Sequence, residues 1–209
     1  EQGTVTIGVS EIALHLLLLP VLGEFRRKYP KIRLRISSYT APQAIQTVRN
    51  GLSDFAVAST PAEVKKPLKA TPLLSFKEIL VANVAYKDIF KEPVSLRKLV
   101  EYPFICLGKN TSTYDFYTRF FLEHGIAMTA DTEAATIDQI LPMVRQNLGI
   151  GFIPEPLAQE VIEQGIVIQV PLLEEPPVRE ICFVEDKSSP HSMAANVLKE
   201  ILFQAGEKE

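Results

Sequence analysis

The chain has 209 residues, which is enough for one large domain or for two lobes of about 100 residues each. Apolar residues make up 46% and charged residues 22% of it, ordinary values for a globular protein that exclude disordered and collagen-like classes. The net charge is −3 and the one basic cluster, Arg26 to Lys28, falls at an expected helix end, so nothing is suited to a nucleic-acid backbone. No apolar run is long enough for a membrane helix.

The first part of the chain alternates strand-like and helix-like patterns. Strands are predicted at 4–9, 32–38, 55–59 and 79–84, with helices between the first three, one reaching residue 29 and one over 42–50. Strands that alternate with helices of this length imply a parallel sheet with right-handed crossovers. A first lobe is therefore expected to end near residue 83.

A second series follows the same order. Helices are predicted at 96–101, 114–124, 137–147 and 157–164, and strands at 104–107, 132–135, 151–153 and 166–170. A strand over 179–184 then leads into a closing helix over 190–204, with Ser189 as its N-cap and Pro190 as its first residue.

The apolar face of the closing helix needs a sheet to cover, and packing on the first lobe would make the chain cross between lobes twice. The crossings are expected near residues 82–86 and 185–187, forming a hinge over a cleft. The predicted fold is thus α/β, with two Rossmann-like lobes joined by two crossover strands. Residues 1–83 and 187–209 would form lobe I, and residues 84–186 lobe II.

No catalytic or metal-binding pattern is present in the sequence. His15, His124 and His191 are scattered, and there is no HxxxH, CxxC, GxSxG or GxxxxGK[ST] motif, so surface or helix-end roles are the simpler interpretation. Cys106 and Cys182 each lie in an apolar strand-like run and are predicted to be buried, reduced thiols. The sequence therefore predicts no enzyme, metal site or cofactor, and a reducing cytoplasm suits it best.

Hydroxyl residues recur where a predicted strand turns into a helix. In parallel α/β lobes such turns lie at the carboxyl edge of the sheet, and helix N-termini there offer N–H donors to an anion. Capping is the alternative: Thr40 with Gln43 and Thr136 with Gln139 match the capping box, and Asn110 could form an Asx turn. The candidate ligand-binding residues are Ser10, Glu11, Thr40, Ala41, Asn110, Thr111, Ser112, Thr136, Ile153 and Pro154.

The last two candidates belong to the segment Gly149-Ile-Gly-Phe-Ile-Pro154. Its two glycines would let the chain leave a helix at Gly149 and approach a ligand at Gly151. The alternative is a helix C-cap followed by a short core strand. Ile153 and Pro154 are interpreted as the wall of the cleft.

The first long helix is apolar over more than one face between Leu14 and Phe25. A helix of this kind needs a partner beyond its own sheet. We therefore expect a homodimer through this helix.

Four segments together resemble the effector-binding domain of LysR-type transcriptional regulators. They are Gly3-Thr-Val-Thr-Ile-Gly8; Leu19-Pro20-Val-Leu22 with Phe25 and Tyr29-Pro30; Gly51-Leu-Ser-Asp54-Phe-Ala-Val57; and Leu148-Gly-Ile-Gly-Phe-Ile-Pro154. The resemblance covers the whole chain in register.

This resemblance implies a type 2 periplasmic-binding-protein fold, two regulatory subdomains and a small effector in the cleft between them. It also implies antiparallel dimers through the first helix, a tetramer for the full-length protein, and DNA binding only through an N-terminal winged helix-turn-helix that would precede Glu1. Ser10 and Thr40 correspond to positions that hold an effector carboxylate or other anion, and the loop 110–113 and the wall 153–154 close the site.

Differences between this sequence and the family pattern narrow the kind of signal that we expect the domain to sense. The peroxide-sensing branch uses a cysteine pair in a loop, whereas Cys106 and Cys182 are predicted strand residues, which disfavours redox sensing. Hydroxyl-rich turns with Tyr39, Tyr114 and Phe152 nearby suit a small monoanion, including an aromatic one. Two other functions stay open: an extracytoplasmic solute-binding protein of a transporter, and an enzyme of this fold, for which Glu11 is the only acid beside a candidate turn.

Overall fold

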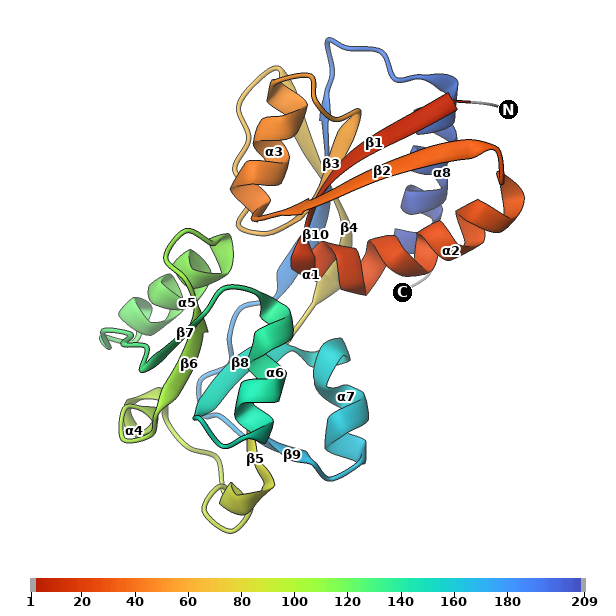
Figure 1. Ribbon diagram of the computed structural model, residues 1–209. Coiled ribbons are helices and arrows are strands. Elements are labelled where there is room, and N and C mark those ends of the chain that lie inside the picture. The colour runs from red at the N-terminus through yellow and green to blue at the C-terminus, as the bar shows by residue number, and fades with distance from the viewer. Residues whose placement is uncertain (1–2, 208–209) are drawn as a thin grey trace. The chain divides into compact units, whose positions relative to one another are not determined.

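Two five-stranded sheets organise residues 3–207, which are the residues that the computed structural model describes (Figure 1). One compact unit contains the residues up to Ser75 and those from Arg179 onward, and the second unit is Phe76–Val178. We call these unit 1 and unit 2. The chain therefore passes between units twice, as the sequence predicted, and both units contain strands paired in parallel and antiparallel fashion.

Unit 1 has the strand order β2-β1-β3-β10-β4. Its elements are β1 (Gly3–Ser10), α1 (Glu11–Ala13), η1 (Leu14–Leu18), α2 (Leu19–Lys28), β2 (Ile32–Tyr39), α3 (Ala41–Arg49), β3 (Phe55–Ser59), β4 (Leu68–Phe76), β10 (Arg179–Asp186) and α8 (Met193–Gly206). Strand β1 pairs in parallel with β2 and β3, while β10 is antiparallel to β3. Helix α3 packs on β1 and β3, and α8 packs on β1 and α2, on the other side of the sheet (Figure 1).

The segments α1, η1 and α2 form one continuous helix, because the residues at both junctions are right-handed helical. This is the first long helix that the sequence predicted, with a π-helical stretch in its middle. The apolar residues Leu18, Val21, Leu22 and Phe25 on it are buried within the chain.

Unit 2 repeats this plan with the strand order β7-β6-β8-β5-β9. Its elements are β5 (Glu78–Asn83), η2 (Val84–Tyr86), α4 (Leu96–Leu99), β6 (Phe104–Leu107), α5 (Ser112–Glu123), β7 (Thr132–Ala134), α6 (Ile137–Arg145), β8 (Ile150–Pro154), α7 (Glu155–Glu163) and β9 (Val167–Val170). Strand β6 is parallel to β7 and β8, whereas β5 is antiparallel to β8 and β9. Aromatic rings fill much of its core, and those of Tyr117 and Phe152 are stacked with their centroids 4.7 Å apart.

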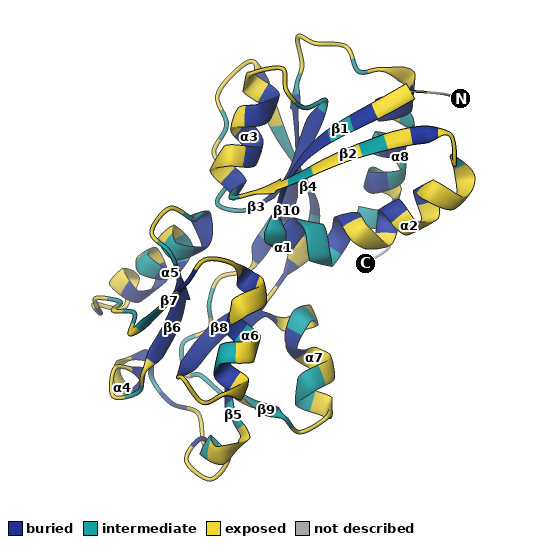
Figure 2. Ribbon diagram, viewed as in Figure 1, coloured by how far each residue is buried: buried dark blue, intermediate teal, exposed yellow. Residues whose placement is uncertain are grey.

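The central strands of both units are buried, while helices such as α3 and α6 bury one face and expose the other (Figure 2). Strand β3 is buried along its whole length, as expected for a central strand with helices on both faces. None of the helices within residues 3–207 combines the length and apolar character needed to cross a bilayer.

The unit boundaries differ from the predicted lobe boundaries by one strand each. Residues 83 and 186 end β5 and β10, yet β5 pairs with β8 and β9 of unit 2 and β10 pairs with β3 of unit 1. Each crossover therefore precedes its strand instead of following it. These two strands enter their sheets antiparallel to their neighbours, so the sheets are mixed and not parallel throughout.

Two elements correct the sequence prediction. Strand β4 was not anticipated because Pro72 interrupts its pattern, but β4 is an edge strand, where a proline is tolerated. The closing helix begins at Met193 with Ser192 as N-cap, since the Ser192 hydroxyl accepts a hydrogen bond from the Ala195 amide (3.1 Å). The predicted start at Pro190, with Ser189 as cap, was wrong.

The carboxylate of Glu185, the second-to-last residue of β10, is buried near the turn that precedes α8. The side chain of Glu185 is only 4% exposed, and its oxygens lie 2.6 Å from Lys187 Nζ, 2.6 Å from Lys199 Nζ and 2.9 Å from His191 Nε2. Burial alone would raise the pKa of Glu185, but the hydrogen bonds from Lys187, Lys199 and His191 outweigh it and lower the pKa to about 2. The charged form of Glu185 therefore stabilises unit 1.

We predict that Glu185→Gln lowers the free energy of unfolding at pH 7 by about 2 kcal/mol. Because the pKa falls from 4.5 to about 2 on folding, this stabilisation is complete above pH 4.5 and is lost as the pH falls toward 2. Urea unfolding at pH 7 and pH 3 should show the wild type and variant converging. The control Asp88→Asn, in an exposed pair with Lys91, should change stability by less than about 0.5 kcal/mol. A pH-independent difference for Glu185→Gln would contradict the assignment.

Candidate functional site

The carboxyl ends of the three parallel strands of unit 1 meet at one edge of its sheet. Ser10 at the end of β1 pairs with Tyr39 at the end of β2, and Ser59 ends β3 on the other side of β1. The structure thereby brings the predicted residues Ser10 and Thr40 to the same edge. Ser59 was missed by the sequence analysis, although it is a hydroxyl residue at the end of a predicted strand and the same rule applied to it.

The hydroxyls of Ser10 and Ser59 form a buried pair at this edge. Both residues are less than 5% exposed, their Oγ atoms are 3.3 Å apart, and the Ser59 amide donates to Ser10 Oγ over 3.0 Å. Ser10 makes no side-chain capping bond to the helix that follows it. Since Ser10 Oγ accepts from the Ser59 amide, the hydroxyl hydrogen of Ser10 is left to act as a donor, either to Ser59 Oγ or to a ligand.

Thr40 has a capping role in addition to any contact with a ligand. Its hydroxyl accepts from the Gln43 amide over 3.4 Å, and the Gln43 side chain accepts from the Thr40 amide over 3.1 Å. Ala41 is buried as the first residue of α3, and Glu11 is half-buried as the first residue after Ser10. Capping thus accounts for part of the Thr40 pattern, and the ligand role of these residues stays a prediction.

In unit 2 the Thr111 hydroxyl, at the corresponding strand-to-helix turn, forms hydrogen bonds within that turn. Thr111 Oγ1 donates to the Gly108 carbonyl (2.9 Å) and accepts from the Tyr114 amide (3.1 Å), so its single donor is already used. Asn110 is exposed and Ser112 is buried at the start of α5.

Thr136 precedes α6 in a capping arrangement. The Gln139 side-chain oxygen accepts from the Ala135 amide (2.8 Å) and from the Thr136 amide (3.4 Å). Thr136 itself is exposed. The capping alternative therefore explains these unit 2 turns better than it explains Ser10.

Residues 150–154 of the segment that begins at Gly149 form the buried strand β8. Asn147, with φ 61°, and not Gly149, has the left-handed conformation that ends α6. Ile153 pairs with Ile79 and is buried, as is Pro154. Gly149 is required for a close approach between strands, because a Cβ there would overlap the Pro103 carbonyl. The expected helix exit at Gly149 was thus wrong, and Gly151 likewise faces protein atoms of Ile105 and Ile140.

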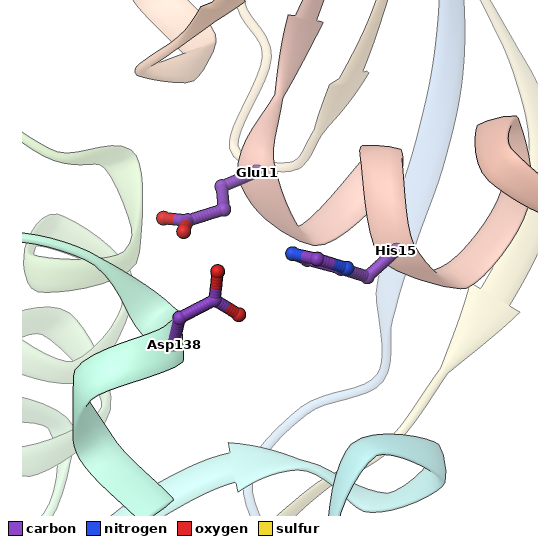
Figure 3. A group of neighbouring side chains, drawn as sticks. All are labelled: Glu11, His15 and Asp138. Carbon is purple, nitrogen blue, oxygen red and sulfur yellow. The ribbon is translucent and has the colours of Figure 1, made fainter.

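Glu11 and His15 place a carboxylate and an imidazole side by side on the first long helix. They lie one helical turn apart, point the same way from the first long helix, and can bring ligand atoms within 4.8 Å of each other (Figure 3). The i, i+4 spacing of Glu11 and His15 is visible in the sequence, but it matches none of the metal motifs built from histidine and cysteine alone. Figure 3 also draws Asp138, the second residue of α6 in unit 2. Two ligands from unit 1 do not by themselves form a metal site.

Both cysteines are buried strand residues, as predicted. Cys106 lies in β6 and Cys182 in β10, and neither is in a disulfide. Burial raises the pKa of Cys106 to about 12 and that of Cys182 to about 11, so both stay protonated and unreactive at neutral pH.

A pocket of about 290 Å³ in unit 2 has the wrong chemistry for an anion. It lies along β5 and β9, and its charged lining residues are Lys77, Glu78, Glu155 and Glu175. The carboxylates of Glu155 and Glu175 outnumber the ammonium of Lys77, which does not favour an anion. The strand edge of unit 1 therefore stays the better candidate for the predicted ligand.

The paired mixed sheets define the class of fold. Among solved structures, the regulatory domain of Synechocystis CcmR in complex with 2-PG has a TM-score of 0.88 with 19% identity, covering 99% of this chain and 98% of that one. The effector binding domain of QuiR in complex with shikimate has a TM-score of 0.85 with 15% identity, covering 100% and 99%. The chain thus has the two-lobed fold of type 2 periplasmic binding proteins.

The chain belongs to the LysR substrate binding domain family, whose model matches residues 1–207. It is 22% identical over 205 residues to a probable RuBisCO transcriptional regulator of Cyanophora paradoxa, covering 96% of this chain and 63% of that protein. It is 24% identical over 155 residues to the HTH-type transcriptional regulator CysB of Burkholderia cenocepacia, covering 74% and 50%. The chain therefore spans half to about two thirds of the length of these curated relatives.

We predict that Gly149→Ala destabilises the chain by about 2 kcal/mol, because the new Cβ would overlap the Pro103 carbonyl at the start of β8. The matched control is Gly23→Ala, whose Cβ meets no atom within 4 Å inside α2 and should stabilise by up to about 1 kcal/mol. Chemical unfolding of both variants checks this. Equal effects of the two substitutions would show that close approach does not explain Gly149.

Proposed function

We propose that this chain is the ligand-sensing domain of a LysR-type transcriptional regulator and that a small anion binds between its lobes at the carboxyl edges of the parallel strands. The observation that carries the proposal is the buried Ser10–Ser59 pair, in which the Ser10 hydroxyl is set to donate. The family match and the small molecules bound to CcmR and QuiR support it. The proposed contacts from unit 2 are those of residues 110–112, Thr136, Ile153 and Pro154.

An anionic effector suits the chemistry of the unit 1 edge. Ser10, Thr40 and Ser59 supply hydroxyls there, and the first long helix starts directly after Ser10 with its amide donors. Arg179, which the sequence analysis did not consider, adds a buried positive charge bonded to the carbonyl of Thr60, the residue after Ser59. Binding by hydroxyls and amides requires no turnover, and we propose that the domain senses its ligand without changing it.

The full-length protein is proposed to act in the cytoplasm and to reach DNA through a winged helix-turn-helix outside this chain. Effector binding would favour one arrangement of the lobes or subunits, and the DNA-binding part would report it. The alternative of a transporter's solute-binding protein is not favoured, because the family and the named relatives are transcriptional regulators.

We also propose a homodimer through the helix from Leu14 to Phe25, and a tetramer for the full-length protein. Intrachain packing already covers most apolar residues of this helix, which weakens the sequence argument for a partner. The proposal is supported instead by apolar side chains that stay exposed. Leu19 on the helix is 47% exposed, and Ile36 and Tyr39 are exposed on the edge strand β2.

Ser10→Ala and Thr40→Val are each predicted to weaken effector binding about tenfold or more, because each removes a hydroxyl donor to a charged ligand. Shikimate, 2-PG and a panel of small carboxylates serve as probes in isothermal titration calorimetry. Thr47→Val is the matched control, since its buried hydroxyl donates to the Ala44 carbonyl inside α3 and should not affect affinity. Wild-type affinity in both site variants, or binding of cationic compounds only, would refute the site.

Leu19→Glu is predicted to shift the chain from dimer to monomer at tens of micromolar concentration, because it places a charge in the proposed interface. Sedimentation equilibrium measures this directly. Leu52→Glu, at another exposed leucine of unit 1, should leave the dimer intact. A wild-type chain that stays monomeric at high micromolar concentration would contradict the proposed dimer.

A further inference from the structure

Four hydrogen bonds join the turn after β3 to the first two residues of β10. Arg179 Nε and Nη2 both donate to the Thr60 carbonyl, over 2.8 Å and 2.6 Å. The Thr60 amide donates to the Glu180 carbonyl over 2.8 Å, and the Glu180 amide donates to Thr60 Oγ1 over 2.9 Å. We call this group the Thr60 clamp.

Burial of the Arg179 guanidinium costs free energy, because the charge loses its hydration. Arg179 is only 1% exposed, and a buried charge is tolerated when hydrogen bonds compensate for its lost hydration. Two donors of a rigid, planar guanidinium on a single carbonyl fix the direction of that carbonyl. The clamp therefore holds the peptide of Thr60 in one orientation.

The clamp is continuous with the Ser10–Ser59 pair through consecutive residues. Strand β3 lies between β1 and β10, and neighbouring amides of a strand point to opposite sides. The Ser59 amide accordingly bonds Ser10 at the end of β1, while the Thr60 amide bonds Glu180 in β10. A displacement of Ser59 must move Thr60 with it.

We propose that Ser59, Thr60 and Arg179 are positioning residues of the effector site, which hold the Ser10 hydroxyl as a donor and couple its occupancy to β10. The inference rests on the proposed effector site at Ser10. When the Ser10 hydroxyl donates to an anion, its oxygen becomes a stronger acceptor for the Ser59 amide, because hydrogen bonds in a chain polarise one another. That tightening reaches β10, the strand by which the chain returns to unit 1.

The coupling can be tested without any ligand, by residue-resolved amide hydrogen exchange of the full chain. Ser10→Ala removes the acceptor of the Ser59 amide, and we expect exchange about fivefold faster at Ser59 and also at Thr60 and Glu180. The Val57 amide in the middle of β3 reports global unfolding. Thr47→Val is the control and should leave the clamp amides unchanged relative to Val57.

The reciprocal variant tests the clamp from its other side. Thr60→Val removes the acceptor of the Glu180 amide, and exchange should rise at Glu180 and at Ser59. Thr60→Ser keeps that oxygen and should show wild-type exchange. If Thr60 mattered only through packing of its methyl group, Thr60→Val, which keeps a methyl group there, would show wild-type exchange instead. The inference is overturned if each substitution changes only the amide that it directly deprives.

Ligand binding separates this inference from the proposed function. With any carboxylate that the wild type binds, Thr60→Val should raise the dissociation constant about three- to fivefold and Thr60→Ser should not. If Ser10→Ala abolishes binding while Thr60→Val binds normally, the positioning role fails and the effector site stands. If Ser10→Ala binds normally, the effector site fails, and the exchange data alone decide whether the clamp is coupled.

Discussion

The parallel pairing of β1 with both of its neighbours is the constraint on which the site depends. It brings the ends of β1, β2 and β3 to one edge, and the bond from the Ser59 amide to the Ser10 hydroxyl closes that edge. A serine at this position would otherwise cap its own helix, as Ser192 does before α8. Because Ser10 bonds β3 instead, its hydroxyl hydrogen is not used to cap the helix, and this is the donor on which the proposed effector site depends.

Strand β10, which is antiparallel to β3, carries two charged residues into the interior of unit 1. Arg179 and Glu185 have the same strand parity as Ile181 and Phe183, which are fully buried, so both charged side chains lie on the same face of the sheet as these two residues. Each is compensated by several hydrogen bonds, Arg179 by the Thr60 carbonyl and Glu185 by two lysines and a histidine. Strand β10 is thereby fixed at both ends, at its start by the Thr60 carbonyl and near its end beside α8.

Local periodicity was enough to predict most of the fold. Strand β3, a continuous apolar run, was predicted with its observed bounds. The alternation of strands and helices correctly predicted two units between which the chain passes twice. The unit to which β5 and β10 belong could not be predicted, since it depends on pairing between residues far apart in sequence. Pro72 concealed β4 for a similar reason, as only the sheet order shows that it is an edge strand.

The candidate site was predictable in part. The strand-end rule identified Ser10 and Thr40, and it would have identified Ser59 had it been applied to the third strand as well. The rule could not separate hydroxyls that cap from hydroxyls that are held by another strand, because Thr111 and Ser10 look alike in sequence and differ only in their partners.

The most direct test of the central claim is a chemical-shift titration of the isotope-labelled chain with small carboxylates, including shikimate. We predict that the largest amide shifts for any compound that binds occur at Glu11 and Ile12, which begin the helix after Ser10, at Ser59, whose amide bonds the Ser10 hydroxyl, and at Thr60, the next residue of the clamp. Binding that shifts other amides and leaves these four unchanged, such as those around the acidic pocket of β5 and β9, would contradict it.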